Sequence, residues 1–394
     1  MQVLEYLRDP RCARRPQDSC CADYRLLCSG IIYRETEGEW YKNEGARFLL
    51  APPLLLYAAS RPFDEYPLEL VLRLTVAHVE ETEKGRFPEG AIAPVTWFHP
   101  DKEVARDLAA LLTVLCRRLI TVMGKSAERV ADYGYPEFER IPQPIRSMRN
   151  VYWPPHPARL VVGRNSKEIE DYNPPAKPVD PGALTALLLG LPQVPHAESI
   201  VASARLYALA LELIHDRQEI AYQLLVSSVE TIASETLPDP DEDEKARRMQ
   251  PVSDLAKTYG LEEGKARSLA ITACNVETRW STRKFKKFLT DNTDNRIWEE
   301  DDLYKVPLPL LPRQENFQQT LSKIYTARSA ATHAGQQFPV TASYSGGPEI
   351  STRVAMKMFS LDSVFPPVVW FERVVNMAIR TYWERAVSAL SDTG

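Results

Sequence analysis

The sequence lacks an excess of positive charge. Its 394 residues include 48 Lys and Arg against 53 Asp and Glu, which gives a formal net charge of −5. This balance excludes a protein-wide positive field that would attract nucleic acid. Any contact with a nucleic acid must therefore come from a local basic patch.

The chain also lacks an uninterrupted hydrophobic run of membrane-spanning length. Its longest apolar stretch, near residues 108–123, is interrupted by Arg117 and Arg118, and this pattern predicts a helix of a soluble protein. The N-terminal residues place charges before any apolar run can form, so no secretory signal is expected. The sequence therefore predicts a cytoplasmic protein without a membrane partner.

Glycine-rich nucleotide loops are missing. Neither G-x-x-x-x-G-K-[ST] nor G-x-G-x-x-G occurs. The segment Ser343-Tyr-Ser-Gly-Gly347 is not a nucleophile elbow, because the order G-x-S-x-G is absent. The chain thus offers no motif for a nucleotide cofactor or a serine hydrolase.

Regularly spaced cysteine pairs are also missing. Four of the six cysteines lie near the N-terminus in the spacing C-x7-C-C-x6-C, with no neighbouring histidine: Cys12, Cys20, Cys21 and Cys28. A zinc site usually has C-x2-C pairs with further His or Cys ligands. Reduced thiols are the favoured interpretation over a zinc site, and no metal or cofactor is expected.

The N-terminal part shows a mixed pattern of secondary structure. At about 150 residues per domain, the length predicts two or three domains. The branched, partly alternating run 68–78 predicts a strand. A strongly periodic helix is expected to begin at Pro100 and to end at Gly124. Residues 1–151 are therefore expected to form an α+β domain of unknown role, as a sensor or regulator.

Residues 152–198 are crowded with proline. Prolines at this density break both helix and sheet, so a linker or extended strap is expected here. From about residue 199 to 394 the pattern becomes almost wholly helical. An N-cap acid at Asp216 with Glu219 three residues on predicts a capping box between two antiparallel helices. The acidic run 238–244 is interpreted as a solvated connector. Further helices are expected at 253–259, at 262–274, from residue 281 or 282, and after Pro366-Pro367.

The most informative helix is predicted over residues 316–334, closed by Gly335. Its apolar stripe at helical spacing leads directly to Arg328, through Phe317, Leu321, Ile324 and Tyr325. A guanidinium therefore lies where the pattern calls for a core residue. Burying an unpaired arginine is costly, so Arg328 should face a partner, a cleft or an anion.

The pair Arg328 and His333 suits RNA cleavage. A histidine can take the ribose 2′-OH proton or donate one to the leaving oxygen, and an arginine can hold the phosphate charge. His333 lies in the last turn, where the helix dipole favours the imidazolium. Five residues place the two side chains about 140° apart on a regular helix. Two copies meeting across a two-fold axis could supply a composite site, so a dimer is expected.

The segment Arg328-Ser-Ala-Ala-Thr-His333, with the polar Ser329 after the arginine, resembles the R-x4–6-H motif of the HEPN superfamily. The wider context is similar to its ApeA-like branch, which is linked to bacterial phage defence. The supporting pieces are Tyr207, residues 216–230, residues 283–288, Ile324-Tyr-Thr-Ala-Arg-Ser329, His333-Ala-Gly335 and Trp370-Phe-Glu372. The resemblance covers roughly residues 199–390 and does not extend to the first 150.

The resemblance implies an all-α HEPN-like helical bundle and a homodimer or higher oligomer. It further implies a metal-independent endoribonuclease with Arg328 and His333 as catalytic residues, used as a toxin in abortive infection and released by a phage-derived trigger. Ser329 and Glu230 would support the site, because an acid in related folds can hold the arginine; the alternative is a surface glutamate. Some family members are non-catalytic modules that bind nucleic acid or a partner protein. For this pair the alternative is a structural arginine and a helix-capping histidine.

A basic stretch with interleaved aromatics occupies residues 279–288. It could grip an RNA backbone while a ring stacks on a base. The alternative is an amphipathic helix with Phe285, Phe288 and Leu289 buried and the lysines in water. The candidate RNA-binding residues are Arg279, Arg283, Lys284, Lys286 and Lys287.

Overall fold

The structure is a computed structural model, and helices make up most of the part of the chain that it describes. The described residues are 2–8, 19–28, 31–33, 48–50, 54–58, 68–77, 100–130, 159–162, 176–214, 217–239, 242–274, 276–298, 312–336, 338–339 and 365–391.

Residue contacts divide the chain into two compact units. The first unit consists of Met1–Glu212, Glu300–Tyr304 and Trp383–Gly394, and the second of Leu213–Glu299 and Lys305–Tyr382. The sequence placed the start of the helical domain at residue 199. The contacts instead assign the first long helix of that region to the first unit.

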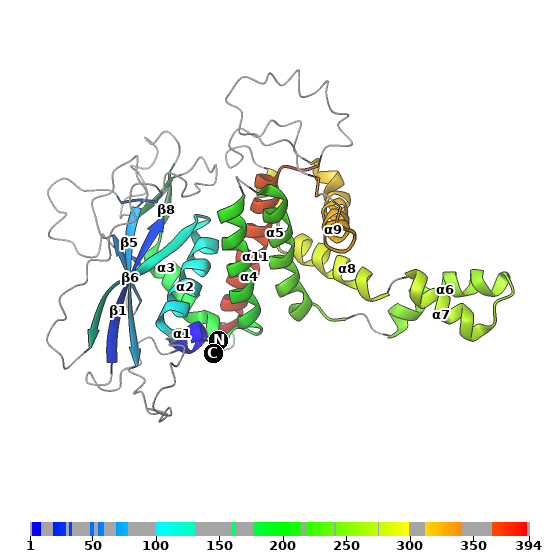
Figure 1. Ribbon diagram of the computed structural model, residues 1–394, viewed down its shortest axis with the longest axis horizontal. Helices are drawn as coiled ribbons and strands as arrows, with labels where there is room; N and C mark the ends of the chain where they lie inside the picture. The colour runs from blue at the N-terminus through cyan, green and yellow to red at the C-terminus, as the bar shows by residue number, and fades with distance from the viewer. Residues whose placement is uncertain are drawn as a thin grey trace, which may run out of the picture. The chain divides into compact units, whose positions relative to one another are not determined.

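The first unit holds two sheets and several helices (Figure 1). A five-stranded antiparallel sheet has the order β3-β4-β5-β1-β6, and a three-stranded parallel sheet has the order β2-β7-β8. The strands are β1 Ser19–Cys28, β2 Ile31–Tyr33, β3 Phe48–Leu50, β4 Leu55–Ala58, β5 Leu68–Ala77, β6 Ile120–Val130, β7 Arg159–Val162 and β8 Ala176–Val179. The helices are α1 Gln2–Arg8, α2 Pro100–Cys116, α3 Pro181–Gly190, η4 Leu191–Gln193 and α4 Ala197–Leu213.

Helix α2 ends earlier than the sequence suggested. It ends at Cys116, and Arg117 then adopts a positive φ of 50°, a left-handed conformation that stops the helix. The Thr113 Oγ1 accepts a hydrogen bond of 3.1 Å from the Ile120 N–H, which starts β6. The predicted helix end at Gly124 is therefore wrong, because Gly124 lies inside β6 and pairs with Arg25.

Regular structure forms inside the proline-rich segment, where a linker or strap was predicted. Pro178 lies in β8, an edge strand of its sheet, where a missing N–H is tolerated. Pro181 is the first residue of α3, a position that suits proline. The Asp180 side chain caps this helix by accepting hydrogen bonds from the Gly182 and Ala183 N–H groups at 2.8 and 3.3 Å.

The second unit is helical (Figure 1). Its core includes Tyr222, whose ring stacks on Phe338 and Phe371 and whose hydroxyl donates to the Pro366 carbonyl. The elements are α5 Gln218–Thr236, α6 Glu242–Thr258, α7 Glu263–Cys274, α8 Val276–Asp291, η5 Asn295–Trp298, η8 Gln314–Asn316, α9 Phe317–Ala334 and α11 Val368–Ser391, of which residues up to Tyr382 belong here.

Three helix predictions need correction. Helix α5 has Arg217 as its N-cap, and no side chain caps it; Asp216 lies outside the described residues. Helix α6 begins at Glu242, well before the predicted 253. The acidic residues 242–244 are thus the first turn of a helix rather than a connector, because carboxylates are favoured at the positive end of the helix dipole.

Helix α8 begins at Val276 rather than at 281 or 282. The predicted α7, α9 and α11 form close to their expected bounds.

Helices α8 and α9 run antiparallel, as a ladder of side-chain contacts shows. Toward the end of α8, Thr290 accepts a hydrogen bond from Gln318 near the start of α9. One turn further along, Lys286 Nζ donates to Ser322 Oγ at 3.2 Å. At the next turn the rings of Phe285 and Tyr325 lie 5.3 Å apart. This register carries Tyr325 and the residues after it toward the beginning of α8.

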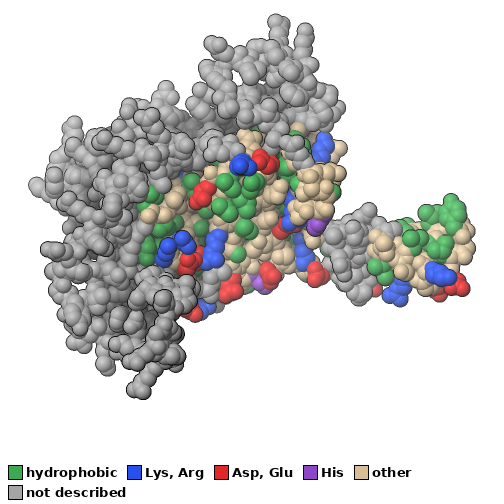
Figure 2. All heavy atoms as spheres, viewed as in Figure 1, with side chains coloured by type: hydrophobic (Ala, Val, Ile, Leu, Met, Phe, Trp, Pro, Cys, Tyr) green, Lys and Arg blue, Asp and Glu red, His purple; other side chains and the backbone are tan. Residues whose placement is uncertain are grey.

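The α6–α7 hairpin has a thin apolar interface. Among its described side chains, the buried apolar groups are those of Ala256, Ala266 and Ala270. Larger apolar side chains of the hairpin are exposed, and Figure 2 shows hydrophobic groups gathered on its surface: Leu255, Tyr259, Leu261, Leu269 and Ile271. The hairpin therefore gains little stabilisation from burial. Among the described helices, none combines the length and the apolar content needed to cross a membrane.

Candidate functional site

Arg328 lies on α9 and faces helix α5. Its Nη2 donates a hydrogen bond of 2.7 Å to Oε2 of Glu230, and the two side chains are 21% and 20% exposed. A charge-assisted bond in such a partly buried setting is stronger than a surface ion pair. The expectation that Arg328 faces a partner is confirmed, and Glu230 is that partner rather than a free surface glutamate.

Tyr325 approaches the same carboxylate one helical turn earlier. Its hydroxyl donates a hydrogen bond of 2.7 Å to Oε1 of Glu230. Burial of the phenol, followed by the hydrogen bond to Glu230, raises the pKa of Tyr325 to about 12. The phenol is therefore a proton donor to Glu230 at any physiological pH.

His333 lies apart from this cluster, in the last turn of α9. The helix ends at Gly335, which has a φ of 61° and donates to the Ala330 carbonyl, as Gln336 also does at 3.3 Å. His333 is exposed, whereas Arg328 and Ser329 are half-buried. The spacing of five residues separates Arg328 and His333 by about 140° and about 7.5 Å along the axis. One chain therefore does not bring these two side chains together.

Most of the basic stretch on α8 is already engaged. Lys284 Nζ pairs with Asp239 at 2.8 Å and donates to the Ser234 carbonyl at 3.1 Å. Lys287 pairs with Asp291 on its own helix at 2.8 Å, and Lys286 bonds to Ser322 of α9. Lys284 and Lys286 thus join α8 to its neighbours and Lys287 pairs within α8, and these contacts use charge that an RNA backbone would need.

The other residues of the stretch 279–288 include arginines and aromatic side chains. The Arg283 guanidinium lies 5.7 Å from the ring centre of the buried Trp280, a cation–π contact. Phe285, Phe288 and Leu289 are buried, so the prediction of an amphipathic helix is correct for them. Arg279 lies on α8, but its side chain is outside the described residues.

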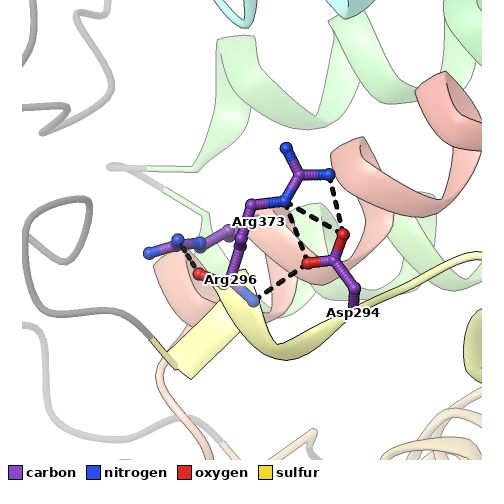
Figure 3. A network of polar contacts seen from close by, with 3 residues as sticks. All are labelled: Asp294, Arg296 and Arg373. Carbon is purple, nitrogen blue, oxygen red and sulfur yellow. Dashed lines mark hydrogen bonds and ion pairs between the residues drawn. The ribbon is translucent and has the colours of Figure 1, made fainter.

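A second charged cluster joins η5 to α11 (Figure 3). The Arg296 side chain makes a fork of hydrogen bonds to Asp294, and these bonds lower the Asp294 pKa below its ordinary value. Arg373 of α11 is 2% exposed and donates from Nη2 to the Arg296 carbonyl. The cluster joins the short helix η5 to α11. We therefore interpret the buried Arg373 as a structural residue.

The cysteine-rich segment of the sequence forms a strand rather than a compact cluster. Cys20, Cys21 and Cys28 all lie on β1, and Cys12 lies outside the described residues. Seven residues of strand separate Cys21 from Cys28 by about 23 Å. Cys28 therefore cannot share a metal ion with Cys20 or Cys21. Within the described residues, no group of three or more His, Cys, Asp or Glu side chains is placed to hold a metal ion.

Sequence reasoning missed the hydroxyl of Tyr325. This residue was assigned to the core stripe, and its ring is indeed buried. The signal that could have found it is the i, i+3 spacing between a tyrosine and an arginine that needs an acidic partner.

The chain was compared with protein-family models, with curated proteins and with solved structures, and none of them matched.

Proposed function

We propose that the protein is a metal-independent endoribonuclease of HEPN type, acting in anti-phage defence at a composite site between two copies of the chain. The observation that carries the proposal is the cluster of Glu230, Tyr325 and Arg328. It holds an arginine at the expected position of the motif, with the acid that related folds place beside it.

Arg328 can bind a phosphate while it stays bonded to Glu230. A guanidinium has five N–H donors. In the described part of the chain, its one recorded hydrogen bond leads to Glu230. The remaining donors can bind a scissile phosphate and offset the charge that develops in the transition state.

His333 supplies the proton transfer in this proposal. It is exposed at the end of α9, so a ribose 2′-OH or a leaving 5′-oxygen can reach it. Because Arg328 and His333 diverge on one helix, the proposal needs His333 of one copy near Arg328 of the other. Ser329, half-buried beside the arginine, is assigned a supporting role.

The direct test is RNA cleavage by the purified full-length protein in EDTA. We expect the wild type to cleave, and Arg328→Ala and His333→Ala each to lose at least a hundredfold in rate. Thr332→Ala is the matched control, because it alters an exposed side chain in the same turn. Cleavage at the wild-type rate by either site variant would overturn the assignment.

Mixing the two inactive variants tests the composite site. A mixed dimer of Arg328→Ala and His333→Ala keeps one intact arginine on one copy and one intact histidine on the other. If the site is shared between copies, mixing restores up to half of the activity in each mixed dimer. Failure to restore activity, with mixed dimers demonstrated, would place both residues of a site in one chain.

A second candidate is a non-catalytic HEPN-like module that dimerises and binds nucleic acid or a partner protein. The pairing of the lysines on α8 and of Arg328 favours it, because these contacts also suit a purely structural role. Expression in cells separates the two candidates. A nuclease is toxic and needs Arg328 and His333 for toxicity, whereas a binding module is tolerated.

The first 151 residues enter the proposal as a regulatory α+β domain that responds to a phage-derived trigger. This part of the proposal rests on the resemblance to defence proteins alone. It predicts that the full-length protein, which cleaves RNA by itself, cleaves faster once the trigger is present.

A further inference from the structure

The Glu230 carboxylate is held from both of its oxygens. Oε1 accepts from the Tyr325 hydroxyl and Oε2 accepts from Arg328 Nη2, each at 2.7 Å. Tyr325 and Arg328 lie three residues apart on α9, so both reach α5 from one face of their helix. A carboxylate engaged at both oxygens cannot rotate without breaking a bond, and the arginine that it holds is thereby oriented.

Tyr325 is itself fixed by its surroundings. Its side chain is 7% exposed, and its ring lies 5.3 Å from that of Phe285 on α8. Because Tyr325 contacts both α5 and α8, its hydroxyl has a fixed position from which it donates to Glu230.

We propose that Tyr325 is a positioning residue: through Glu230 it orients the Arg328 guanidinium so that its remaining N–H donors face a phosphate group. The inference rests on the proposed function for its consequence in RNA cleavage. The orientation of the guanidinium is a property of the free protein and can be measured separately.

The variant that tests it is Tyr325→Phe, which removes one hydroxyl and keeps the ring. Tyr222→Phe is the matched control. It also removes a buried hydroxyl from the second unit, where that hydroxyl donates to the Pro366 carbonyl and does not contact Glu230. Both variants lose a buried hydrogen bond, so a general loss of stability would affect them alike.

The first readout is the NMR spectrum of 15N-arginine-labelled full-length protein, with the Arg328 signals assigned by their loss in Arg328→Lys. A fixed guanidinium rotates slowly and shows separate Nη–H resonances. We expect separate resonances in the wild type and in Tyr222→Phe, and a single averaged signal in Tyr325→Phe. Averaged Arg328 signals in the wild type, or separate ones in Tyr325→Phe, would overturn the proposal whether or not the protein cleaves RNA.

The second readout is cleavage kinetics. Tyr325→Phe should lower kcat by roughly tenfold with a much smaller change in KM, because a loosened arginine loses mainly transition-state stabilisation. Tyr222→Phe should keep kcat within about twofold of the wild type, because the Tyr222 hydroxyl does not contact Glu230 and its loss affects stability alone. If the wild type does not cleave, the proposed function fails while the NMR result still decides the positioning role. An unchanged kcat in Tyr325→Phe, with an active wild type, would contradict it.

Discussion

Arg328 and Glu230 are 98 residues apart in the sequence, and a 2.7 Å hydrogen bond joins them. The bond ties α9 to α5, and each side chain is about one-fifth exposed. The strength of this bond therefore indicates how firmly the position of Arg328 in the candidate site is fixed.

A double-mutant cycle should give this pair a coupling of about 1 to 2 kcal/mol, above that of an exposed pair but below that of a fully buried one. The cycle uses Glu230→Ala, Arg328→Ala and the double variant, with urea unfolding as the measurement. Lys287 and Asp291 provide the control, because they form an exposed pair on one helix. That control should couple by less than about 0.5 kcal/mol. Equal coupling in both cycles would show that Glu230 adds nothing special to Arg328.

The end of α9 depends on a glycine. Gly335 has a φ of 61°, and a Cβ built there would meet no atom within 4 Å, so its replacement costs backbone strain alone. Gly335→Ala should lower the free energy of unfolding by about 1 kcal/mol. Gly264→Ala is the control, because Gly264 lies in α7 with equally open space and without a positive φ. It should raise stability by several tenths to about 1 kcal/mol. Thermal unfolding should shift in opposite directions, and shifts of the same sign would contradict the capping role.

Tyr325 gives the protein a dependence on alkaline pH. Its folded pKa of about 12 lies above the ordinary value of 10.0, because burial and Glu230 disfavour the phenolate. A group with a raised folded pKa contributes stability that is fully present below pH 10 and is lost as the pH rises toward 12. The stability difference between wild type and Tyr325→Phe should therefore shrink across this range in urea unfolding. A difference that stays constant from pH 9 to 12 would exclude the raised pKa.

Arg373 should be among the costliest arginines to remove. It is 2% exposed and donates to the Arg296 carbonyl, so Arg373→Ala removes a part-buried hydrogen bond and leaves a cavity. We expect a loss of about 2 to 4 kcal/mol in the free energy of unfolding. Arg380→Ala, on the exposed side of the same helix, should change it by about 0.5 kcal/mol or less. Equal urea midpoints for the two variants would refute the packing role of Arg373.

The helix that carries the site could be predicted from local patterns in the sequence, whereas its partner Glu230 was named only through the family resemblance. The stripe from Phe317 to Tyr325 and the glycine at 335 indicate α9 almost to the residue, because helical spacing and capping are local properties. The contact between Arg328 and Glu230 depends on how α5 packs against α9. No local pattern specifies that packing, and Glu230 alone resembles any surface glutamate.

The same limit applies to the ends of other elements. The apolar run of α2 continues past Cys116, but the hydrogen bond from Ile120 to Thr113 and the left-handed Arg117 begin a strand instead. That choice follows from pairing with β1, which is distant in sequence. The order of the strands in the larger sheet, with β1 between β5 and β6, is likewise a product of long-range pairing.

The α6–α7 hairpin is inserted between two helices that pack together directly, α5 and α8. Its own two helices contact chiefly each other. Lys284 on α8 pairs with Asp239, three residues beyond the end of α5, and the eight residues of α8 before Lys284 span only about 12 Å. A short linker can therefore join residue 239 to residue 276 without moving Glu230 or Tyr325. We therefore expect that the hairpin can be shortened or exchanged for another sequence while Glu230 and Arg328 keep their contact.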